Sequence, residues 1–227
     1  MVGTTPNKQK RGSSLSLKLI ILGPPGSGKG TMAEKLCSDF SLFHLSPGEI
    51  LRDEVMKNTV LGSRIKGMVQ SGKLVPAELV VEMVKLVLGS EKKYLLDGFP
   101  RSVEQAKLIH DFGVDFVILL DASEDAIVAR LRDRRVCSKG IHGYHLKNLP
   151  PKKAGVCDVD GTPLVCREDD KPAVIRKRFE VYRKETIPVI AHYAKLGKVI
   201  SVDAITGEID DVYARVCSGL AAKGIKK

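Results

Sequence analysis

The sequence has no tryptophan, few aromatic residues and no long apolar run. A membrane-spanning helix requires about 20 apolar residues, and the longest candidate, "LKLIILG" at 17–23, is far shorter. Proteins that bind single-stranded nucleic acids interleave aromatic with basic side chains, but aromatic residues make up only 5% of this chain. We therefore expect neither a membrane nor a nucleic-acid partner, although the formal net charge is +10.

Cysteine is also scarce and irregularly spaced. The five cysteines, at 37, 137, 157, 166 and 217, form an odd set without a signal peptide upstream. This pattern disfavours a disulfide framework and favours a reduced, cytoplasmic location. The basic, acid-free start of the chain makes a mitochondrion or another organelle the alternative.

What the sequence does contain is an alternation of short apolar strands with helical patterns. Strands are expected at 17–22, 43–46, 94–97, 115–121 and 198–203. Helices are expected to begin near Lys29, Ser102 and Ser123, which predicts βαβ units. The predicted fold class is α/β, with a doubly wound, five-stranded parallel sheet whose ligands lie beyond the carboxyl ends of the strands.

Two segments interrupt this alternation. Residues 46–80 predict a small helical insertion, whereas 136–170 are rich in Gly, Pro, Lys and Asp and lack a helical period. We interpret the second segment as a lid that excludes water from the reaction. The predicted organisation is completed by three core segments and two tails: core 17–45, 81–135 and 171–222, a disordered basic lead at 1–16 and a short tail at 223–227.

A glycine-rich loop follows the first strand. In "GPPGSGKGT" (23–31) the glycines let backbone N–H groups point at phosphate oxygens, and the next helix presents its positive end. Lys29 can reach the β- and γ-phosphates, and Thr31 supplies a hydroxyl for Mg²⁺. A glycine turn that only caps a helix is the alternative. Because strand, loop, lysine and helix occur together, the loop predicts a nucleoside triphosphate site.

Carboxylates and arginines lie at the ends of these elements. Asp97 ends a buried strand, where it can orient Mg²⁺ and its waters, and Arg101 follows the turn 98–100. Further arginines suited to bidentate phosphate contacts are Arg52, Arg130, Arg134, Arg167 and Arg178, whereas Arg132 and Arg135 fit a solvated helix face. No Ser-His-Asp set is evident. This pattern favours an acceptor that is already an anion, such as a nucleoside monophosphate.

The segment "SPGEILR" (46–52) carries a helix-start signal. Ser46 and Glu49 have the spacing of a capping box, and Pro47 takes the first helical position. This structural interpretation does not exclude a functional role for Arg52, which lies one turn later in the same helix.

Together these motifs resemble the adenylate kinases of the long-lid type. The resemblance covers about 17–222 and rests on six motifs in family order: "GPPGSGKGT", "GKLVPAELV" (72–80), "LLDGFPRSVEQA" (95–106), "RLRDRRV" (130–136), "GYHLKNLPP" (143–151) and "CREDDKPAVIRKR" (166–178). It implies a monomeric enzyme that converts Mg·ATP and AMP into two ADP. The alternatives are a GTP:AMP phosphotransferase or another nucleoside monophosphate kinase and, more distantly, a P-loop regulatory ATPase.

The resemblance also implies roles for single residues. The implied ATP site comprises Gly26, Ser27, Gly28, Lys29, Gly30, Thr31, Arg130, Arg134, Gly143 and Tyr144. The implied AMP site comprises Pro47, Gly48, Arg52, Lys73, Leu74, Val75, Gly98, Phe99, Pro100, Arg101, Gln105, Arg167 and Arg178. The implied catalytic residues are Lys29, Asp97, Arg101, Arg134, Arg167 and Arg178. Thr31 and Asp97 would hold Mg²⁺, Asp97 through water, while Asp169 and Asp170 would brace the lid.

The chain departs from the family pattern at three places. Pro47-Gly48-Glu49 stands where the family usually has Thr-Gly-Asp, so selectivity for the acceptor base is open. Segment 202–209 lacks the Lys-Pro that often follows the donor adenine, so ATP rather than GTP remains an expectation. In the lid, Cys137, Cys157 and Asp160 match three of the four positions of a zinc site. We expect no structural Zn²⁺, because His142 would supply the fourth ligand only if the loop refolds.

Overall fold

The computed structural model describes residues 16–139 and 142–227, so all of the predicted basic lead except Ser16 lies outside the described residues. Its centre is a five-stranded sheet with the order β2-β3-β1-β4-β8. The strands are β1 (Leu17–Leu22), β2 (Phe43–Leu45), β3 (Lys93–Asp97), β4 (Phe116–Asp121) and β8 (Val199–Asp203). All neighbours pair in parallel. The predicted α/β fold class is confirmed.

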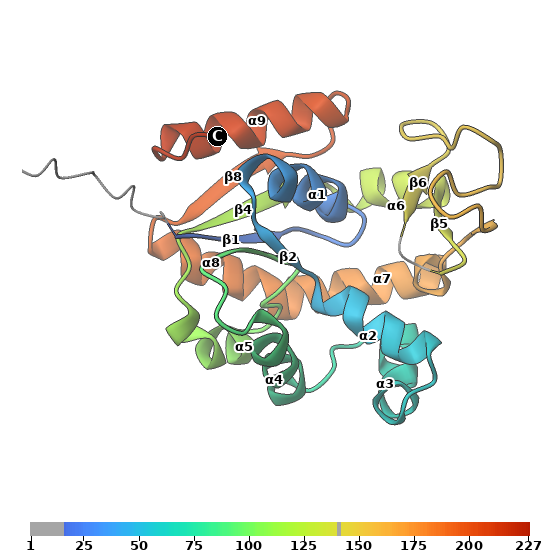
Figure 1. Ribbon diagram of the computed structural model, residues 1–227, viewed down its shortest axis with the longest axis horizontal. Helices are drawn as coiled ribbons and strands as arrows, with labels where there is room; N and C mark the ends of the chain where they lie inside the picture. The colour runs from blue at the N-terminus through green and yellow to red at the C-terminus, as the bar shows by residue number, and fades with distance from the viewer. Residues whose placement is uncertain (1–15, 140–141) are drawn as a thin grey trace, which may run out of the picture.

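Helices cover both faces of the sheet (Figure 1). One face carries α1 (Lys29–Phe40) and α9 (Ile209–Ala222); the other carries α4 (Ala77–Leu88), α5 (Val103–Leu108) and α8 (Ile187–Lys195). Residues of β1 alternate between the two cores: Ile20 packs on the α4 side, and Leu19 and Ile21 on the α1 side. Because both faces are buried, residues 19–22 of the strand form a continuous apolar run.

Two insertions lie at the same end of the sheet, beyond the carboxyl ends of its strands (Figure 1). The helical insertion contains α2 (Pro47–Met56) and α3 (Val60–Ser71). The lid is a small antiparallel sheet with the order β6-β5-β7, made by β5 (Arg134–Cys137), β6 (Gly143–His145) and β7 (Leu164–Val165). The boundaries expected at 80 and 135 fall inside α4 and β5, so they cut through elements that fold as units.

The lid is flanked by helices of the core. Helix α6 (Glu124–Arg132) precedes it, and η2 (Glu168–Asp170) and α7 (Pro172–Val181) follow it; η1 (His110–Phe112) closes the segment after α5. A π-helical turn, η3 (Tyr182–Thr186), joins α7 to α8. The N–H of Ile187 donates to the carbonyl of Tyr182, five residues back. Pro188 follows at once and has no N–H, so the regular ladder is interrupted there.

The expected helix starts are all found: α1 begins at Lys29, α2 at Pro47, α5 at Val103 and α6 at Glu124. Ser102 accepts a hydrogen bond from Gln105 N (3.2 Å), and Ser123 caps α6 in the same way. The expected capping box of Ser46 and Glu49 is wrong, because Ser46 makes no side-chain cap. Glu49 instead lines the cleft described below. Among the described residues, no helix is long and apolar enough to cross a membrane.

Candidate active site

A cleft of about 480 Å³ opens beyond the carboxyl ends of the strands. It is lined by the glycine-rich loop, by Asp97 after β3, by α2, by the lid and by α7. Crevices at this end of a parallel sheet are where α/β proteins bind ligands. The parts of the chain that were expected to carry chemistry, namely the glycine-rich loop, Asp97 and the arginines, therefore meet in one cleft.

The glycine-rich loop presents unpaired donors to this cleft. Gly26 and Gly28 have φ values of +81° and +91°, a backbone region that favours glycine. Helix α1 begins directly afterwards, with no side-chain cap and no acidic residue in its first turn. Its free N–H groups and positive dipole end are therefore available to an anion.

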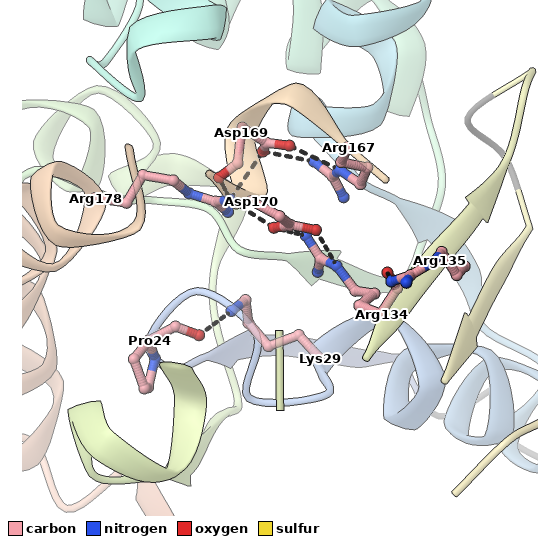
Figure 2. Close-up of polar contacts among 8 residues, drawn as sticks. All are labelled: Pro24, Lys29, Arg134, Arg135, Arg167, Asp169, Asp170 and Arg178. Atoms are coloured by element: carbon pink, nitrogen blue, oxygen red, sulfur yellow. Dashed lines mark hydrogen bonds and ion pairs between the residues drawn. The ribbon is translucent and has the colours of Figure 1, made fainter. Parts of the chain in front are cut away.

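Lys29 lies half-buried over this loop (Figure 2). Its Nζ donates to the carbonyls of Gly23 (3.0 Å) and Pro24 (2.8 Å). Burial lowers the pKa of Lys29 to about 7, and although Asp97 opposes the shift, Arg101 adds to it. The amine is thus held in the cleft without a carboxylate salt bridge, so a phosphate can replace its carbonyl partners.

Two arginines converge at the other end of the cleft, around Gly48. A Cβ placed on Gly48 would lie 3.2 Å from Arg52 Nη1 and 3.4 Å from Arg101 Nη2. Burial lowers the pKa of Arg52 to about 9, which leaves it charged at neutral pH, and burial also lowers the pKa of Arg101. Within the described residues no carboxylate pairs with Arg52. The pair therefore concentrates positive charge at this end of the cleft.

A smaller pocket of about 80 Å³ continues from these arginines. Its lining includes nearly all of the residues expected to bind the acceptor: Pro47, Gly48, Arg52, Lys73, Leu74, Val75, Gly98, Phe99, Arg101 and Gln105. Gln105 is buried, and its Oε1 accepts from Arg101 N at 2.7 Å. The expected residue Pro100 follows Phe99 through a cis peptide bond.

Three arginines and two aspartates form a cluster between the two ends (Figure 2). Arg167 donates to both carboxylate oxygens of Asp169 (2.8 and 2.7 Å), and Arg178 Nη1 donates to Asp169 Oδ2 at 2.8 Å. Arg134 Nε donates to Asp170 Oδ2 at 2.7 Å. Asp170 therefore links β5 to η2, and Asp169 links η2 to α7.

The charge balance in this cluster favours an anion. Burial opposes the ionisation of Asp169, but Arg178 and Arg167 outweigh it, so the pKa of Asp169 is held well below its usual range. Burial lowers the pKa of Arg178 to about 10, which leaves it charged. Three arginines then face two carboxylates, so the cluster carries an excess of positive charge.

The remaining donor-side residues lie on the cleft wall. Gly30, Thr31, Arg130, Gly143 and Tyr144 all line it. Arg130 Nη2 donates to the carbonyl of Ala204, in the loop after β8. Tyr144 turns its hydroxyl away, into the lid, where it accepts from Asp158 N at 2.7 Å.

Two polar residues near Asp97 escaped the sequence analysis. His44, on β2, places Nε2 at 3.5 Å from Asp97 Oδ2, and this carboxylate raises the pKa of His44. Glu49 faces the same region, where burial raises its pKa. The available signal was positional, because β2 and β3 are neighbours whose carboxyl ends meet at one edge. Thr186 also lines the cleft, and it was not predicted as a site residue because no sequence motif marks it.

Four potential metal ligands gather inside the lid. The donor atoms of Cys137, His142, Cys157 and Asp160 all lie within 4.8 Å of one another. The expectation that His142 reaches this group only after the loop refolds is wrong. Asp160 Oδ2 is buried and has no hydrogen-bond partner among the described residues; His142 Nδ1 lies 3.5 Å from it. Gly140, which stands where a C-x₂-C pair beginning at Cys137 would have its second cysteine, lies outside the described residues.

Comparisons with known proteins agree with this geometry. A family model described as "Adenylate kinase" matches residues 21–198. An adenylate kinase of Petrotoga mobilis is 42% identical over 202 residues, covering 86% of this chain and 94% of that protein. An adenylate kinase of Clostridium tetani is 39% identical over 215 residues, covering 91% and 99%. The chain belongs to the adenylate kinase family.

Proposed function

We propose that this phosphotransferase moves the terminal phosphoryl group of Mg·ATP to AMP, reversibly, through the residues assembled in the cleft. The observation that carries the proposal is the presence of two anion sites joined by an arginine cluster: the loop 23–28 with Lys29, and Arg52 with Arg101 around Gly48. A regulatory ATPase needs only the first of these sites.

The donor triphosphate binds across the glycine-rich loop. Backbone N–H groups at the start of α1 donate to its phosphates, and Lys29 exchanges its carbonyl partners for phosphate oxygens. Thr31, through its hydroxyl, and Asp97, through water, would hold the Mg²⁺ ion that accompanies the nucleotide, and the ion would neutralise phosphate charge there. Arg130 holds the donor from the side of the lid.

The acceptor needs no general base. An oxygen of the AMP phosphate attacks the γ-phosphorus, the bond to the bridging β–γ oxygen breaks, and that oxygen leaves as part of ADP. Arg52 and Arg101 hold the acceptor phosphate, and Gln105 reads the base. Arg134, Arg167 and Arg178 neutralise the charge on the transferring group, kept in place by Asp169 and Asp170.

The decisive experiment measures ADP formation from Mg·ATP with AMP, GMP, CMP and UMP as acceptors. We expect turnover with AMP, and loss of at least about 10³-fold in kcat/KM for Lys29→Ala and Arg101→Ala. Arg132→Ala is the matched control, since Arg132 is exposed and outside the cleft. Near-normal activity of the Lys29 or Arg101 variant would overturn the site; turnover with another monophosphate alone would overturn the acceptor. Repeating the assay with GTP tests the donor.

We also propose that the lid holds a structural Zn²⁺ ion through Cys137, His142, Cys157 and Asp160. Zinc in structural sites takes four ligands of this chemistry, and the unpartnered Asp160 oxygen fits the role. The apolar core of the lid is small, comprising Cys137, Tyr144 and Cys157 with Leu164 beside them. Such a core gives little stability alone, and a bound metal would cross-link it.

Metal analysis of the purified protein tests this second proposal. We expect one equivalent of zinc, and the spectrum of tetrahedral, thiolate-bound cobalt after exchange with Co²⁺. Cys157→Ser and His142→Ala should lower the metal content and the melting temperature. Cys166→Ser, which removes an exposed cysteine outside the cluster, should change neither. A metal-free protein whose melting is insensitive to both zinc and chelator would contradict the proposal.

The cytoplasmic location and the monomeric state belong to the same proposal. Sedimentation of the full chain and localisation of a tagged copy test them directly.

A further inference from the structure

Arg101 lies in a segment that is neither helix nor strand, between β3 and α5. Its backbone N–H and C=O therefore lack ladder partners, and buried groups of this kind must be satisfied elsewhere. Side chains from two other places do this. Gln105 Oε1 accepts from Arg101 N at 2.7 Å, and Thr186 Oγ1 donates to Arg101 O at 2.9 Å.

Thr186 reaches Arg101 from 85 positions along the chain, out of the π-helical turn η3. It is one of few buried polar residues, with 5% of its surface exposed, and it borders the cleft. A π-turn inserts one residue into a helix, which rotates the residues beyond it by about 100° relative to an uninterrupted helix. The helices α7 and α8 and the turn η3 between them form one continuous helical segment. The turn therefore determines which residue of this segment faces Arg101.

We propose that Thr186 is a positioning residue for Arg101 and thereby for the acceptor phosphate. The backbone of Arg101 is held from both sides, and its guanidinium is fixed as well, since Nε donates to Gly98 O at 2.6 Å. The same helical segment carries Arg178, about two turns before Thr186. This one segment therefore carries Arg178 of the transfer cluster and, through Thr186, positions Arg101 at the acceptor site. The inference rests on the proposed role of Arg101 in binding AMP.

The consequence is specific to the acceptor. Without the hydroxyl, the Arg101 carbonyl loses a buried partner, and Arg101 shifts relative to Arg52. Thr186 lies far in sequence from the glycine-rich loop and makes none of the hydrogen bonds to Lys29. Loss of the hydroxyl should therefore raise the KM for AMP and leave that for ATP unchanged, whereas general destabilisation would move neither KM selectively.

Steady-state kinetics of Thr186→Val and Thr186→Ser test the proposal. Valine keeps the shape without the hydroxyl, and serine keeps the hydroxyl. For Thr186→Val we expect the KM for AMP to rise about three- to tenfold, with the KM for ATP within twofold of wild type. Thr186→Ser should restore wild-type values. Ser123→Ala, which removes the α6 cap outside the cleft, is the control for stability and should leave both KM values unchanged.

Three results would overturn the inference: an unchanged KM for AMP in Thr186→Val, an equal rise in both KM values, or a serine variant as impaired as the valine variant. Arg101→Ala is assayed in parallel. If it retains a normal KM for AMP, the proposed function of Arg101 fails as well. If it loses AMP binding while Thr186→Val does not, only the positioning role of Thr186 is wrong.

Discussion

At the scale of single residues, Lys29 couples nucleotide binding to protons. Its pKa of about 7 in the free protein means that most Lys29 amines are neutral at pH 8. Bound phosphates favour the charged form and raise this pKa, so binding at pH 8 should take up about one proton. At pH 6 the amine is already charged, and the uptake should vanish.

Calorimetric titration of Mg·ATP in two buffers of different ionisation enthalpy measures this proton directly. We expect the binding heat to depend on the buffer at pH 8 and not at pH 6. Lys29→Met should abolish the dependence. Equal heats in both buffers at pH 8 would mean that Lys29 keeps an ordinary pKa despite its burial.

Pro47 governs a second residue-scale property, the choice of acceptor base. It lines the small pocket beside Leu51, Val75 and Val80, and the Oε1 atom of Gln105 is engaged by Arg101. Pro47→Thr would add a hydroxyl where the family usually has one. We expect the preference for AMP over CMP, as a ratio of kcat/KM values, to rise about fivefold. Pro47→Ala adds no hydroxyl and should leave the ratio unchanged; a rise in both variants would indicate that removal of the ring is responsible.

At the scale of elements, α3 depends on a close approach to the end of α2. A Cβ on Gly62 would lie 2.0 Å from the carbonyl oxygen of Glu54, whereas one on Gly67 would meet nothing within 4 Å. Gly62→Ala should therefore push the helices apart and destabilise the protein by about 1–3 kcal/mol. Gly67→Ala, on the same helix, should stabilise it by up to about 1 kcal/mol through helix propensity. Urea denaturation of both variants measures their free energies of unfolding and tests this prediction. Equal changes in the two variants would contradict the close packing at Gly62.

The core strands and the starts of α1, α5 and α6 were predicted to within one residue because their signals are local. "LKLIIL" is apolar on both faces, and Ser102 and Ser123 cap the helices that they precede. The lid strands were missed because they are only two to four residues long and pair antiparallel through a loop without periodicity. The π-turn at Thr186 depends on tertiary contacts that no spacing reveals.

The candidate site was likewise predictable where its residues belong to elements with local signals, and not where their positions depend on tertiary contacts. The glycine-rich loop and Asp97 lie at the carboxyl ends of predictable strands, so their meeting follows from the parallel sheet. The place of His142 beside Cys157 depends instead on how the loop after β5 turns, which composition does not specify. The failed cap at Ser46 has a related cause, since Glu49 faces the charged cleft rather than the helix end.

At the scale of the whole molecule, the groups that surround the transferring phosphoryl come from parts that are far apart in the chain. Arg52 belongs to the helical insertion, Arg134 to the lid and Arg178 to α7. A ligand that spans both anion sites gives all of them one common partner. We therefore expect a dinucleotide that joins two adenosines through five phosphates to draw the lid and the insertion toward the core, at the expense of open cleft volume.

Small-angle scattering of the full chain measures this closure as a decrease in the radius of gyration. The decrease should appear with the joined ligand, be smaller with Mg·ATP alone, and be absent in Lys29→Met at the same concentrations. Arg167 and Arg178 would then exchange part of their contact with Asp169 for phosphate, which requires the lid to move as a body. An unchanged radius at saturation, verified by calorimetry, would mean that the cleft already has its working shape and that segment 136–170 is a fixed wall rather than a lid.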